Sequence, residues 1–380
     1  MTGFKMPSRV LLIFGTRPEG IKMMPVARAL RASQKLNQTI CVTGQHRQML
    51  DQVFIAFGEK PDLDFDIMAP NQTLGDITTA VLNRTAQVLA DHKPDLVLVH
   101  GDTTTAMAAA MAAFYAGAPL GHVEAGLRSF DLQRPWPEEF NRVMIDSLAA
   151  LMFAPTQGAA ANLCREYNQK GRVLVTGNTG IDALLYIAAR IRCEAKLRAE
   201  MAARYSFLDA NRKLILVTGH RRESFGEGFQ RICDGLASIA ERLDVELIYP
   251  VHLNPQVQGT VQQRLGSHPN IHLIPPVDFL DMVYLMLRAA ILITDSGGVQ
   301  EEGPALGKPV LLLREVTERP EAVALGAVKL VGTDSALMRM EVDLLLDDGE
   351  EYARRAVPVF PYGDGNAAHR IVAAIEEFCG

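Results

Sequence analysis

Short apolar runs alternate with longer helix-like stretches along almost the whole chain. The runs are continuously apolar, which is typical of strands buried on both faces of a parallel sheet. A repeated strand–helix rhythm of this kind predicts a doubly wound α/β fold. The clearest strands are expected at Val10–Phe14, Ile40–Thr43, Leu96–Val99, Gly121–Glu124, Val173–Thr176, Leu214–Thr218, Glu246–Pro250, Ile291–Thr294 and Pro309–Leu313.

The length of 380 residues favours two domains, because one domain typically takes about 150 residues. A Gly-Asn-Thr-Gly turn at 177–180 precedes a long charged helix expected at about 181–204, and a second strand–helix series starts near Arg212. We therefore expect two Rossmann-like domains, 1–177 and 178–362, that face a cleft. The tail at 363–380 is amphipathic, and we expect its helix to pack back on the first domain.

Composition excludes several classes of protein. The net charge of −6 argues against a nucleic-acid-binding surface. The five cysteines are odd in number and scattered, which favours a reducing cytoplasm over a disulfide framework. The first residues lack the apolar region of a secretory signal. The longest uncharged run, Thr103–Val123, fits a buried helix and strand better than a membrane span. We expect a cytoplasmic protein with no membrane or nucleic-acid partner.

Polar residues follow six of the expected strands at the point where each strand ends. Ligands of open α/β sheets bind outside these carboxyl ends. A single glycine there often only ends a strand, but six such junctions together predict a ligand site. They are Gly15-Thr16-Arg17, Gly44-Gln45-His46, Gly101-Asp102, Glu124-Ala125-Gly126, Gly219-His220 and Asp295-Ser296-Gly297.

The turn at Ser296-Gly297-Gly298 has the character of a phosphate site. It joins a strand to a helix and so presents backbone N–H groups and the positive end of a helix dipole. Glu301 and Glu302 follow and can accept hydrogen bonds from sugar or ribose hydroxyls, and Arg319 can close on the ligand. The alternative is an ordinary turn with a solvated glutamate pair.

Two cations near the first strand suit a diphosphate. Arg17 can act from the loop and Lys22 from the following helix, whose first turn contains Pro18. The alternative is a solvated helix start.

Familiar cofactor motifs are absent. The first strand is followed by Gly15-Thr-Arg-Pro-Glu-Gly20 and not by G-x-G-x-x-G, and Gly307-Lys308 is followed by proline, so no P-loop is present. The His122-Val-Glu124 segment is similar to half of a zinc-deaminase signature, but no P-C-x-x-C accompanies it. We expect no bound cofactor and no metal.

Three carboxylates are the candidates for acid–base chemistry. Asp102 and Glu124 each follow a strand, and Glu138 opens a helix after a Pro-Trp-Pro segment. Carboxylates facing one cleft repel each other and spread their pKa values, which provides an acid and a base together. His220, beside two arginines, suits a phosphate donor or proton carrier. The alternatives are a favourable helix-start charge for Glu138 and a backbone-bonded ring for His220.

Taken together, these residues resemble the bacterial non-hydrolysing UDP-N-acetylglucosamine 2-epimerases. The resemblance covers nearly the whole chain, and the motifs are highly specific when all occur in this order. They are Gly15-Thr-Arg-Pro-Glu, Val99-His-Gly-Asp-Thr-Thr-Thr, His122-Val-Glu-Ala-Gly-Leu-Arg, Pro135-Trp-Pro-Glu-Glu-Phe-Asn-Arg, Thr218-Gly-His-Arg-Arg-Glu, Thr294-Asp-Ser-Gly-Gly-Val-Gln-Glu-Glu and Gly363-Asp-Gly-Asn-Ala-Ala.

The resemblance implies two Rossmann-like domains of the glycosyltransferase-B type, a homodimer, and interconversion of UDP-GlcNAc and UDP-ManNAc. It implies elimination of UDP to 2-acetamidoglucal and re-addition of UDP after a proton returns to the opposite face of C2. The missing nicotinamide motif agrees with this, because C2 cannot then be acidified by oxidising a neighbouring carbon. Loss of the leaving group instead needs strong stabilisation of the diphosphate.

The resemblance also assigns roles by motif. The catalytic set would be Asp102, Glu124, Glu138, Arg142 and His220, with the residue that takes the C2 proton left open. UDP contacts would be Arg17, Lys22, Ser296, Gly297, Gly298, Glu302 and Arg319. An allosteric UDP-GlcNAc site beside the active site would use Gln45, Gln48, Glu139, Arg221 and His252.

The sequence departs from the family pattern in two places. Asn71 stands where activated members tend to have arginine, which argues against allosteric activation. Val277 and Met282 stand where members often place glutamine and an aromatic residue near the uracil. Backbone contacts can still recognise uracil, so we expect the protein to bind the same nucleotide, UDP, as other members.

Three alternatives stay open. A UDP-sugar glycosyltransferase of the same fold would require an acceptor. A hydrolysing 2-epimerase would release ManNAc and UDP. A catalytically silent nucleotide-sugar sensor would not need the carboxylates, and the presence of Asp102, Glu124, Glu138 and His220 weighs against it.

Overall fold

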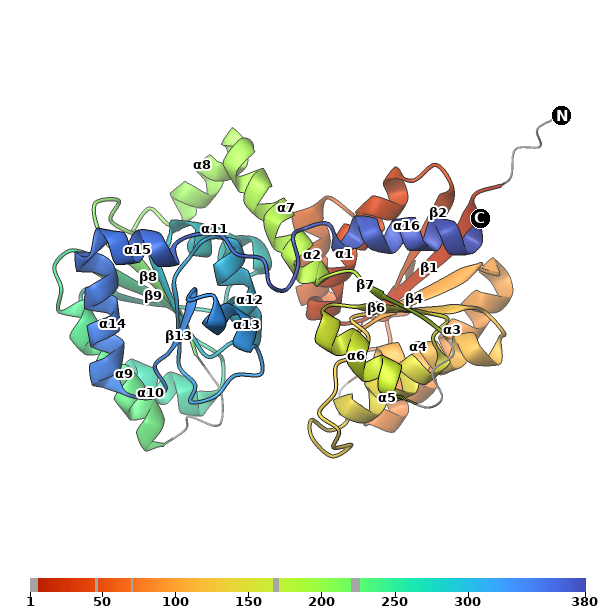
Figure 1. Cartoon of the computed structure of the whole chain (residues 1–380), viewed down its shortest axis with the longest axis horizontal. Coiled ribbons are helices and arrows are strands. Elements are labelled where there is room, and N and C mark those ends of the chain that lie inside the picture. Colours follow the sequence, from red (N-terminus) through yellow and green to blue (C-terminus); the bar gives the residue numbers. More distant parts are fainter. Residues whose placement is uncertain (1–5, 45–46, 70, 167–170, 220–225) are drawn as a thin grey trace. The chain divides into compact units, whose positions relative to one another are not determined.

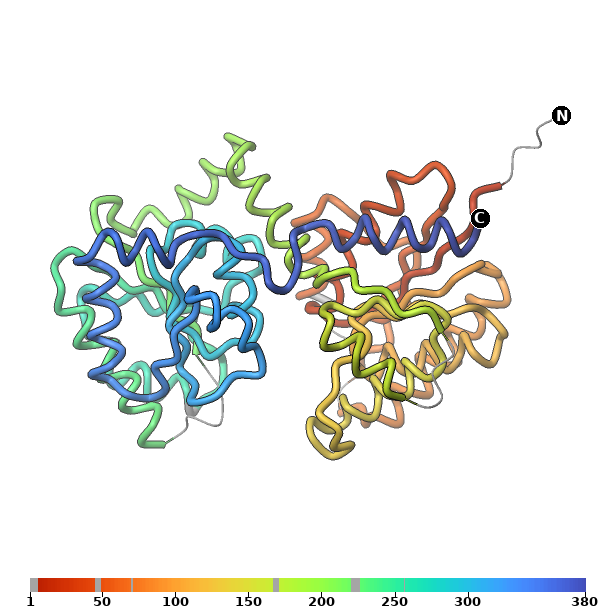
Figure 2. Tube along the Cα trace, in the orientation of Figure 1, coloured from red at the N-terminus to blue at the C-terminus, as the bar shows by residue number. Residues whose placement is uncertain are grey.

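The computed structural model describes residues 6–44, 47–69, 71–166, 171–219 and 226–380. The chain forms two compact units, Met1–Ala183 together with Tyr362–Gly380, and Leu184–Pro361. The boundary between them falls inside helix α7, Thr179–Cys193. Figure 1 labels most elements of each unit, and Figure 2 follows the same path as a Cα trace.

The first unit contains a parallel sheet with seven strands among the described residues, in the order β3-β2-β1-β4-β5-β6-β7. Central strands such as β1 are apolar and buried along most of their length, as expected for a sheet covered on both faces. The strands are β1 Ser8–Phe14, β2 Leu36–Val42, β3 Leu63–Asp64, β4 Leu96–His100, β5 Leu120–Val123, β6 Leu151–Ala154 and β7 Arg172–Val175.

Threonine begins four of the helices in this unit. Thr16, Thr73, Thr103 and Thr156 each accept a hydrogen bond from a backbone N–H of the first helical turn. These four helices and two others, α2 and α5, connect successive strands of the parallel sheet. They are α1 Arg17–Ala32, α2 Arg47–Phe57, α3 Leu74–His92, α4 Thr104–Tyr115, α5 Glu138–Leu148 and α6 Gln157–Arg165.

The second unit contains a parallel sheet in the order β10-β9-β8-β11-β12-β13. Its strands are β8 Lys213–Thr218, β9 Val245–Pro250, β10 Ile271–Ile274, β11 Ile291–Thr294, β12 Val310–Leu312 and β13 Val328–Leu330. Its helices are α8 Ala195–Arg204, α9 Glu227–Ala240, α10 Pro255–Leu265, α11 Phe279–Arg288, α12 Gly297–Ala305, α13 Pro320–Ala324, α14 Ser335–Asp347 and α15 Gly349–Arg355.

The chain returns to the first unit through its last helix, α16, Ala367–Cys379. This helix lies beside α1 in Figure 2 and contacts it. The hydroxyl of Ser33 donates to Glu376 at 2.6 Å, and the backbone N–H of Ala368 donates to Asp182 at 2.8 Å. Ile371 and Ile375 are fully buried, so α16 contributes to the core of this unit.

The α/β fold predicted from the sequence is confirmed, and the apolar runs lie within or beside parallel strands. Four strands were not predicted: β3, β6, β10 and β13. β3 has only two residues, and β6 continues the apolar end of helix α5 without a turn signal. The single helix expected at about 181–204 is wrong, because Glu194 adopts an extended conformation and separates α7 from α8.

Candidate functional site

Two carboxylates lie at neighbouring strand ends in the first unit. Strands β4 and β5 pair in parallel up to His100 and Val123. The chain then turns at Gly101, whose N–H donates to the carbonyl of Val123 at 2.9 Å. Asp102 follows this turn, and Glu124 follows the end of β5. The strand register therefore brings both side chains to the same edge of the sheet, as the sequence predicted.

Glu124 has a strained backbone and a cationic partner. Its φ of 71° is in the left-handed region, which a non-glycine residue adopts only at a cost of about 1–3 kcal/mol. The ammonium group of Lys22, from α1, contacts the Oε2 atom of Glu124. The Nε2 atom of His100 lies 3.9 Å from the same oxygen. The loop thus holds this carboxylate in a defined place at the sheet edge.

Asp102 is paired with Arg142 from α5, whose Nη2 atom lies 2.7 Å from Oδ2 of Asp102. Burial raises the pKa of Asp102 above the ordinary aspartate value. Arg142 opposes this change, and the negative charges of Glu124 and Glu138 add to it. Asp102 therefore retains a proton to higher pH than a solvated aspartate does.

Helix α5 brings two glutamates to this region with different partners. Glu138 lies in the first turn, near enough to Asp102 to affect its pKa. Glu139 is buried, and its two carboxylate oxygens accept hydrogen bonds from the N–H groups of Ser129 and Phe130 at 3.0 and 2.9 Å. The carboxylate of Glu139 therefore holds the loop that precedes the helix.

A buried network lies beneath both catalytic candidates. Asp146 contacts the Nδ1 atom of His122 at 2.5 Å and Arg128 at 2.7 Å, and it accepts from the N–H of Gly126 at 3.1 Å. The other ring nitrogen of His122 lies 2.8 Å from the carbonyl of Gly101. Burial alone would raise the pKa of Asp146, but His122 and Arg128 hold it below the ordinary value. One carboxylate thus fixes the turns that contain Asp102 and Glu124.

Glu19 performs a similar task at the start of α1. Its Oε2 atom accepts from the N–H groups of Gly15 and Thr16 at 3.0 and 2.7 Å. Its Oε1 atom accepts from the hydroxyl of Thr103, the N-cap of α4, at 2.6 Å. Burial raises the pKa of Glu19, although these hydrogen bonds favour the ionised form. The first turns of α1 and α4 are therefore held together by one carboxylate.

In the second unit, helix α12 begins directly after β11. Ser296 is its N-cap residue, and the N–H of Ser296 donates to the hydroxyl of Thr294 at 2.9 Å. Gly297 and Gly298 form the first turn, where backbone N–H groups have no partner within the helix and favour anions. A Cβ atom on Gly298 would come no closer than 3.8 Å to another residue. The backbone of this turn is thus accessible from that side.

Arg319 reaches the same helix start. Its Nε atom lies 2.5 Å from Oε1 of Glu301, and a Cβ atom on Gly297 would lie 3.0 Å from its Nη1 atom. Thr317 fixes the loop, because its hydroxyl accepts from the N–H of Arg319 at 3.0 Å and donates to Gln300 at 2.6 Å. The side chain of Glu302 also faces this turn, 3.9 Å from the Cβ position of Gly298.

The comparisons with known proteins agree with these motifs. The family model described as UDP-N-acetylglucosamine 2-epimerase matches residues 28–376. The chain belongs to the UDP-N-acetylglucosamine 2-epimerase family. It is 52% identical to the UDP-N-acetylglucosamine 2-epimerase of Salmonella typhimurium, over 97% of this chain and 99% of that protein.

Solved structures extend the likeness to the fold. The crystal structure of the Neisseria meningitidis epimerase bound to UDP-GlcNAc is 46% identical, with a TM-score of 0.87, and covers 97% of this chain and all of that one. The Methanocaldococcus jannaschii epimerase in complex with UDP-GlcNAc and UDP is 33% identical, with a TM-score of 0.77, over 97% and 99% of the two chains. The resemblance to the epimerase family and to its glycosyltransferase-B-like fold is confirmed.

The structure brings together part of the predicted epimerase site. One region of the first unit contains the predicted acid–base residues and their cationic partners, which are Asp102, Glu124, Glu138, Arg142 and Lys22. One region of the second unit contains five predicted UDP contacts, which are Ser296, Gly297, Gly298, Glu302 and Arg319. Arg17 opens helix α1 and is half-buried.

Several predicted residues are described only in part or not at all. Gln45, His220 and Arg221 lie outside the described residues, and only the backbone of Gln48, in α2, is described. His252 is exposed, and its Nδ1 atom accepts from the N–H of Asn254 at 3.1 Å. The allosteric site stays a prediction.

Sequence reasoning missed the supporting residues Glu19, Arg128 and Asp146. His122 and Arg128 belong to the His-Val-Glu-Ala-Gly-Leu-Arg motif, but the residue that both of them contact, Asp146, lies outside it. Asp146 carries no local signal, because it looks like any polar residue on the surface of an amphipathic helix.

The described residues contain no group of three or more His, Cys, Asp or Glu side chains arranged to hold a metal ion. None of the helices described has the length and apolar character needed to cross a membrane.

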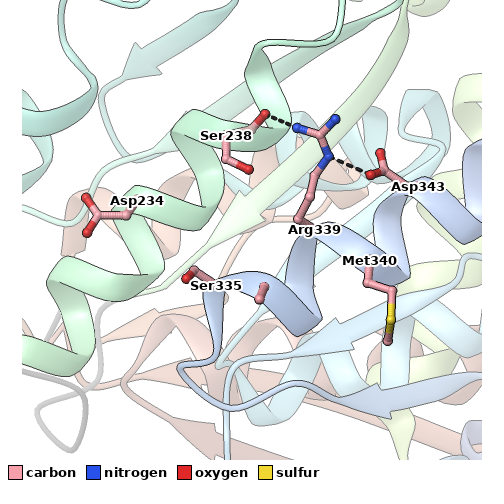
Figure 3. Close-up of a pocket in the computed structure, with 7 residues that line it drawn as sticks. Asp234, Ser238, Ser335, Arg339, Met340 and Asp343 are labelled. Atoms are coloured by element: carbon pink, nitrogen blue, oxygen red, sulfur yellow. Dashed lines mark hydrogen bonds and ion pairs between the residues drawn. The ribbon is translucent and has the colours of Figure 1, made fainter.

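A surface hollow of about 500 Å³ lies between α9 and α14 in the second unit and is shown in Figure 3. Arg339 there is engaged by Asp343 at 2.7 Å and by the carbonyl of Ser238. The hollow is lined by helix flanks and not by strand ends, so it is separate from the predicted site. Its lining residues are Asp234, Ser238, Ser335, Ala336, Arg339, Met340 and Asp343.

Proposed function

We propose that this protein is a non-hydrolysing epimerase that interconverts UDP-GlcNAc and UDP-ManNAc by inverting C2 of the sugar. Membership of the epimerase family supports the substrate class. The observation that carries the chemistry is the gathering of Asp102, Glu124 and Glu138 beside two cations at one sheet edge. An enzyme that removes and returns a proton at carbon needs such a pair of acid and base groups.

The reaction begins when a carboxylate removes the proton from C2. The C1–O bond breaks, its electron pair leaves with UDP, and the C–H electrons form the C1–C2 double bond of 2-acetamidoglucal. A proton then returns to the opposite face of C2, and the same UDP oxygen attacks C1. Asp102 and Glu124 differ in environment, which fits one acid and one base at the same pH.

The second unit supplies the leaving-group site in this proposal. The N–H groups at Ser296, Gly297 and Gly298 would bind the phosphates, and Glu302 would accept from the ribose hydroxyls. Charge on the diphosphate would be balanced by Arg17, Lys22, Arg142, His220 and Arg319. Tight binding of UDP after the C1–O bond breaks keeps the nucleotide in place for re-addition.

Incubation with UDP-GlcNAc alone separates this proposal from its alternatives. We expect UDP-ManNAc to form without an acceptor and without release of free UDP in proportion to turnover. A glycosyltransferase would leave UDP-GlcNAc unchanged until an acceptor is added. A hydrolysing epimerase would release ManNAc and UDP together, and a silent sensor would give neither product.

We also propose that the protein is a homodimer and that it is located in the cytoplasm. The second domain, 178–362, would bind UDP. Light scattering should give twice the chain mass of 41.6 kDa. A single-chain mass at micromolar concentration would remove the dimer from the proposal without affecting the chemistry.

A further inference from the structure

His100 is a buried histidine with no assigned role. It is the last residue of β4, only 3% of its surface is exposed, and neither ring nitrogen has a hydrogen-bond partner among the residues that the structure describes. A buried polar group left in this state costs about 1–3 kcal/mol. The pKa of His100 is lowered to about 3, chiefly by burial. Lys22 and His122 also lower this pKa, whereas the negative charge of Glu124 raises it. At neutral pH the ring is therefore uncharged and carries one N–H.

The ring faces the same oxygen atom that Lys22 contacts. The Nε2 atom of His100 lies 3.9 Å from Oε2 of Glu124, which is about 1 Å beyond an ordinary N–H···O distance. A hydrogen bond between these atoms requires them to approach by about 1 Å. Oε2 of Glu124 thus lies between a cation on α1 and a neutral donor on β4.

Lys22 has two competing partners in the proposed reaction. The structure pairs it with Glu124, whereas the proposed function assigns it to the substrate diphosphate. If a phosphate takes Lys22, Glu124 loses the positive charge that contacts its Oε2 atom. A nearby cation favours the ionised form of a carboxylate, so its departure leaves a stronger base.

We propose that His100 is a positioning residue that takes over from Lys22 when the diphosphate binds. The Nε2–H group then donates a hydrogen bond to Oε2 of Glu124 and holds the carboxylate toward the substrate. A neutral donor lowers the basicity of a carboxylate less than a contacting cation does. Substrate binding therefore makes Glu124 a stronger base while its geometry is kept. This inference rests on the proposed function of Lys22.

Nitrogen NMR of 15N-histidine-labelled protein tests the exchange without any turnover. The His100 signals are assigned by their loss in His100→Gln. We expect UDP to shift the Nε2 signal of His100 in the wild-type protein. Lys22→Met should produce a similar shift without UDP, because the contact between Lys22 and Glu124 is already lost. A His100 signal that responds neither to saturating UDP nor to Lys22→Met would overturn the proposal.

Kinetics supply a readout that a purely structural role would not change. We expect His100→Leu to lower kcat by a factor on the order of 10–100, with KM little changed, since a misplaced catalytic group has costs of this size. The acid limb of kcat should move to higher pH, because Glu124 in the complex has lost its donor. The acid limb of kcat/KM should stay, because Lys22 still pairs with Glu124 in the free enzyme. His100→Gln, which keeps an N–H donor, should recover part of kcat.

His272→Leu is the matched control. His272 is a half-buried histidine in the second unit, 3.1 Å from a buried glutamate, Glu246, and has no role in the proposed reaction. Its loss should lower stability but leave both pH limbs in place. Equal shifts of both limbs in His100→Leu, or the same small effect in the two variants, would contradict a positioning role. Failure of the wild type to form UDP-ManNAc would instead contradict the proposed function, and the NMR result with UDP would still be readable.

Discussion

At the residue scale, the three carboxylates of the first unit differ in what surrounds them. Asp102 is half-buried and paired with Arg142, Glu124 contacts Lys22, and Glu138 lies in the first turn of α5. Unequal surroundings separate the protonation states of groups of the same type. Such a difference is what the proposed proton transfer at C2 requires, because one group must give a proton while another takes one.

Asp102→Asn, Glu124→Gln and Glu138→Gln test these roles. Each substitution keeps the shape of the side chain and removes its capacity to carry a proton. We expect each variant to lose about 10²-fold or more in kcat, as for general acid–base groups. Thermal unfolding measured alongside provides the control. A nearly normal rate combined with a large fall in Tm would assign the residue to the structure and not to catalysis.

Glu19 gives a prediction for the pH dependence of stability. Its pKa is raised in the folded protein, so the folded state holds this proton more tightly than the unfolded chain does. The resulting stabilisation is complete below the unfolded pKa of about 4.3 and is lost as the pH rises through the folded pKa. Glu19→Gln mimics the protonated form at every pH.

Urea unfolding of both proteins measures this difference. From about pH 4.3 upward, the unfolding free energy of the wild type should fall relative to that of Glu19→Gln, until Glu19 is fully ionised. A difference between the two proteins that rises with pH would show that the hydrogen bonds to ionised Glu19 outweigh its burial.

At the scale of elements, Asp146 on α5 fixes two loops through His122, Arg128 and Gly126. Asp146→Asn removes one charged partner of Arg128, whose side chain is only 1% exposed. We expect a loss of about 3–5 kcal/mol in unfolding free energy, as for other broken buried pairs. Denaturant titration measures this loss.

Glu166→Gln is the control for that measurement. Glu166 binds the same arginine, but its side chain is 33% exposed, so its charge is partly screened by solvent. We expect a loss below about 1 kcal/mol. Equal losses in the two variants would contradict a special role for Asp146.

The start of α12 can be tested separately from the stability of the second unit. An alanine at Gly298 meets no atom of the protein closer than 3.8 Å, but its methyl group would occupy space beside the proposed phosphate site. We expect Gly298→Ala to weaken UDP binding by about tenfold, or about 1.4 kcal/mol, in calorimetry. Gly349→Ala, at the start of α15, where a Cβ atom meets nothing within 4 Å, should leave UDP affinity unchanged. Unchanged affinity in both variants would argue against phosphate binding at α12.

The sequence predicted those elements that can be recognised from a pattern of neighbouring residues. β11 and the turn after it were predicted because an apolar run ends in Asp-Ser-Gly-Gly. Asp102 and Glu124 were expected at one edge because parallel strands align their carboxyl ends. The break at Glu194 and the strand β3 carry no comparable pattern. Glu19 and Asp146 acquire their roles only through partners on other elements, so their roles could not be derived from the chain order.

At the scale of the whole molecule, the proposed chemistry divides between the two units. The proposed acid–base groups belong to the first unit, which α16 completes, and the proposed phosphate turn belongs to the second. Elimination needs both, because proton removal at C2 is unproductive unless the departing UDP is stabilised. Re-addition needs both as well, since UDP must stay bound until C2 is protonated again.

Proton NMR of UDP-GlcNAc with the enzyme in D2O tests this account most directly. Removal and return of the C2 proton through solvent-exchanging groups predicts UDP-ManNAc that carries deuterium at C2. The UDP-GlcNAc pool should also become deuterated as the reaction reverses, without free UDP accumulating in step. Turnover to UDP-ManNAc with the original proton retained at C2 would contradict the account.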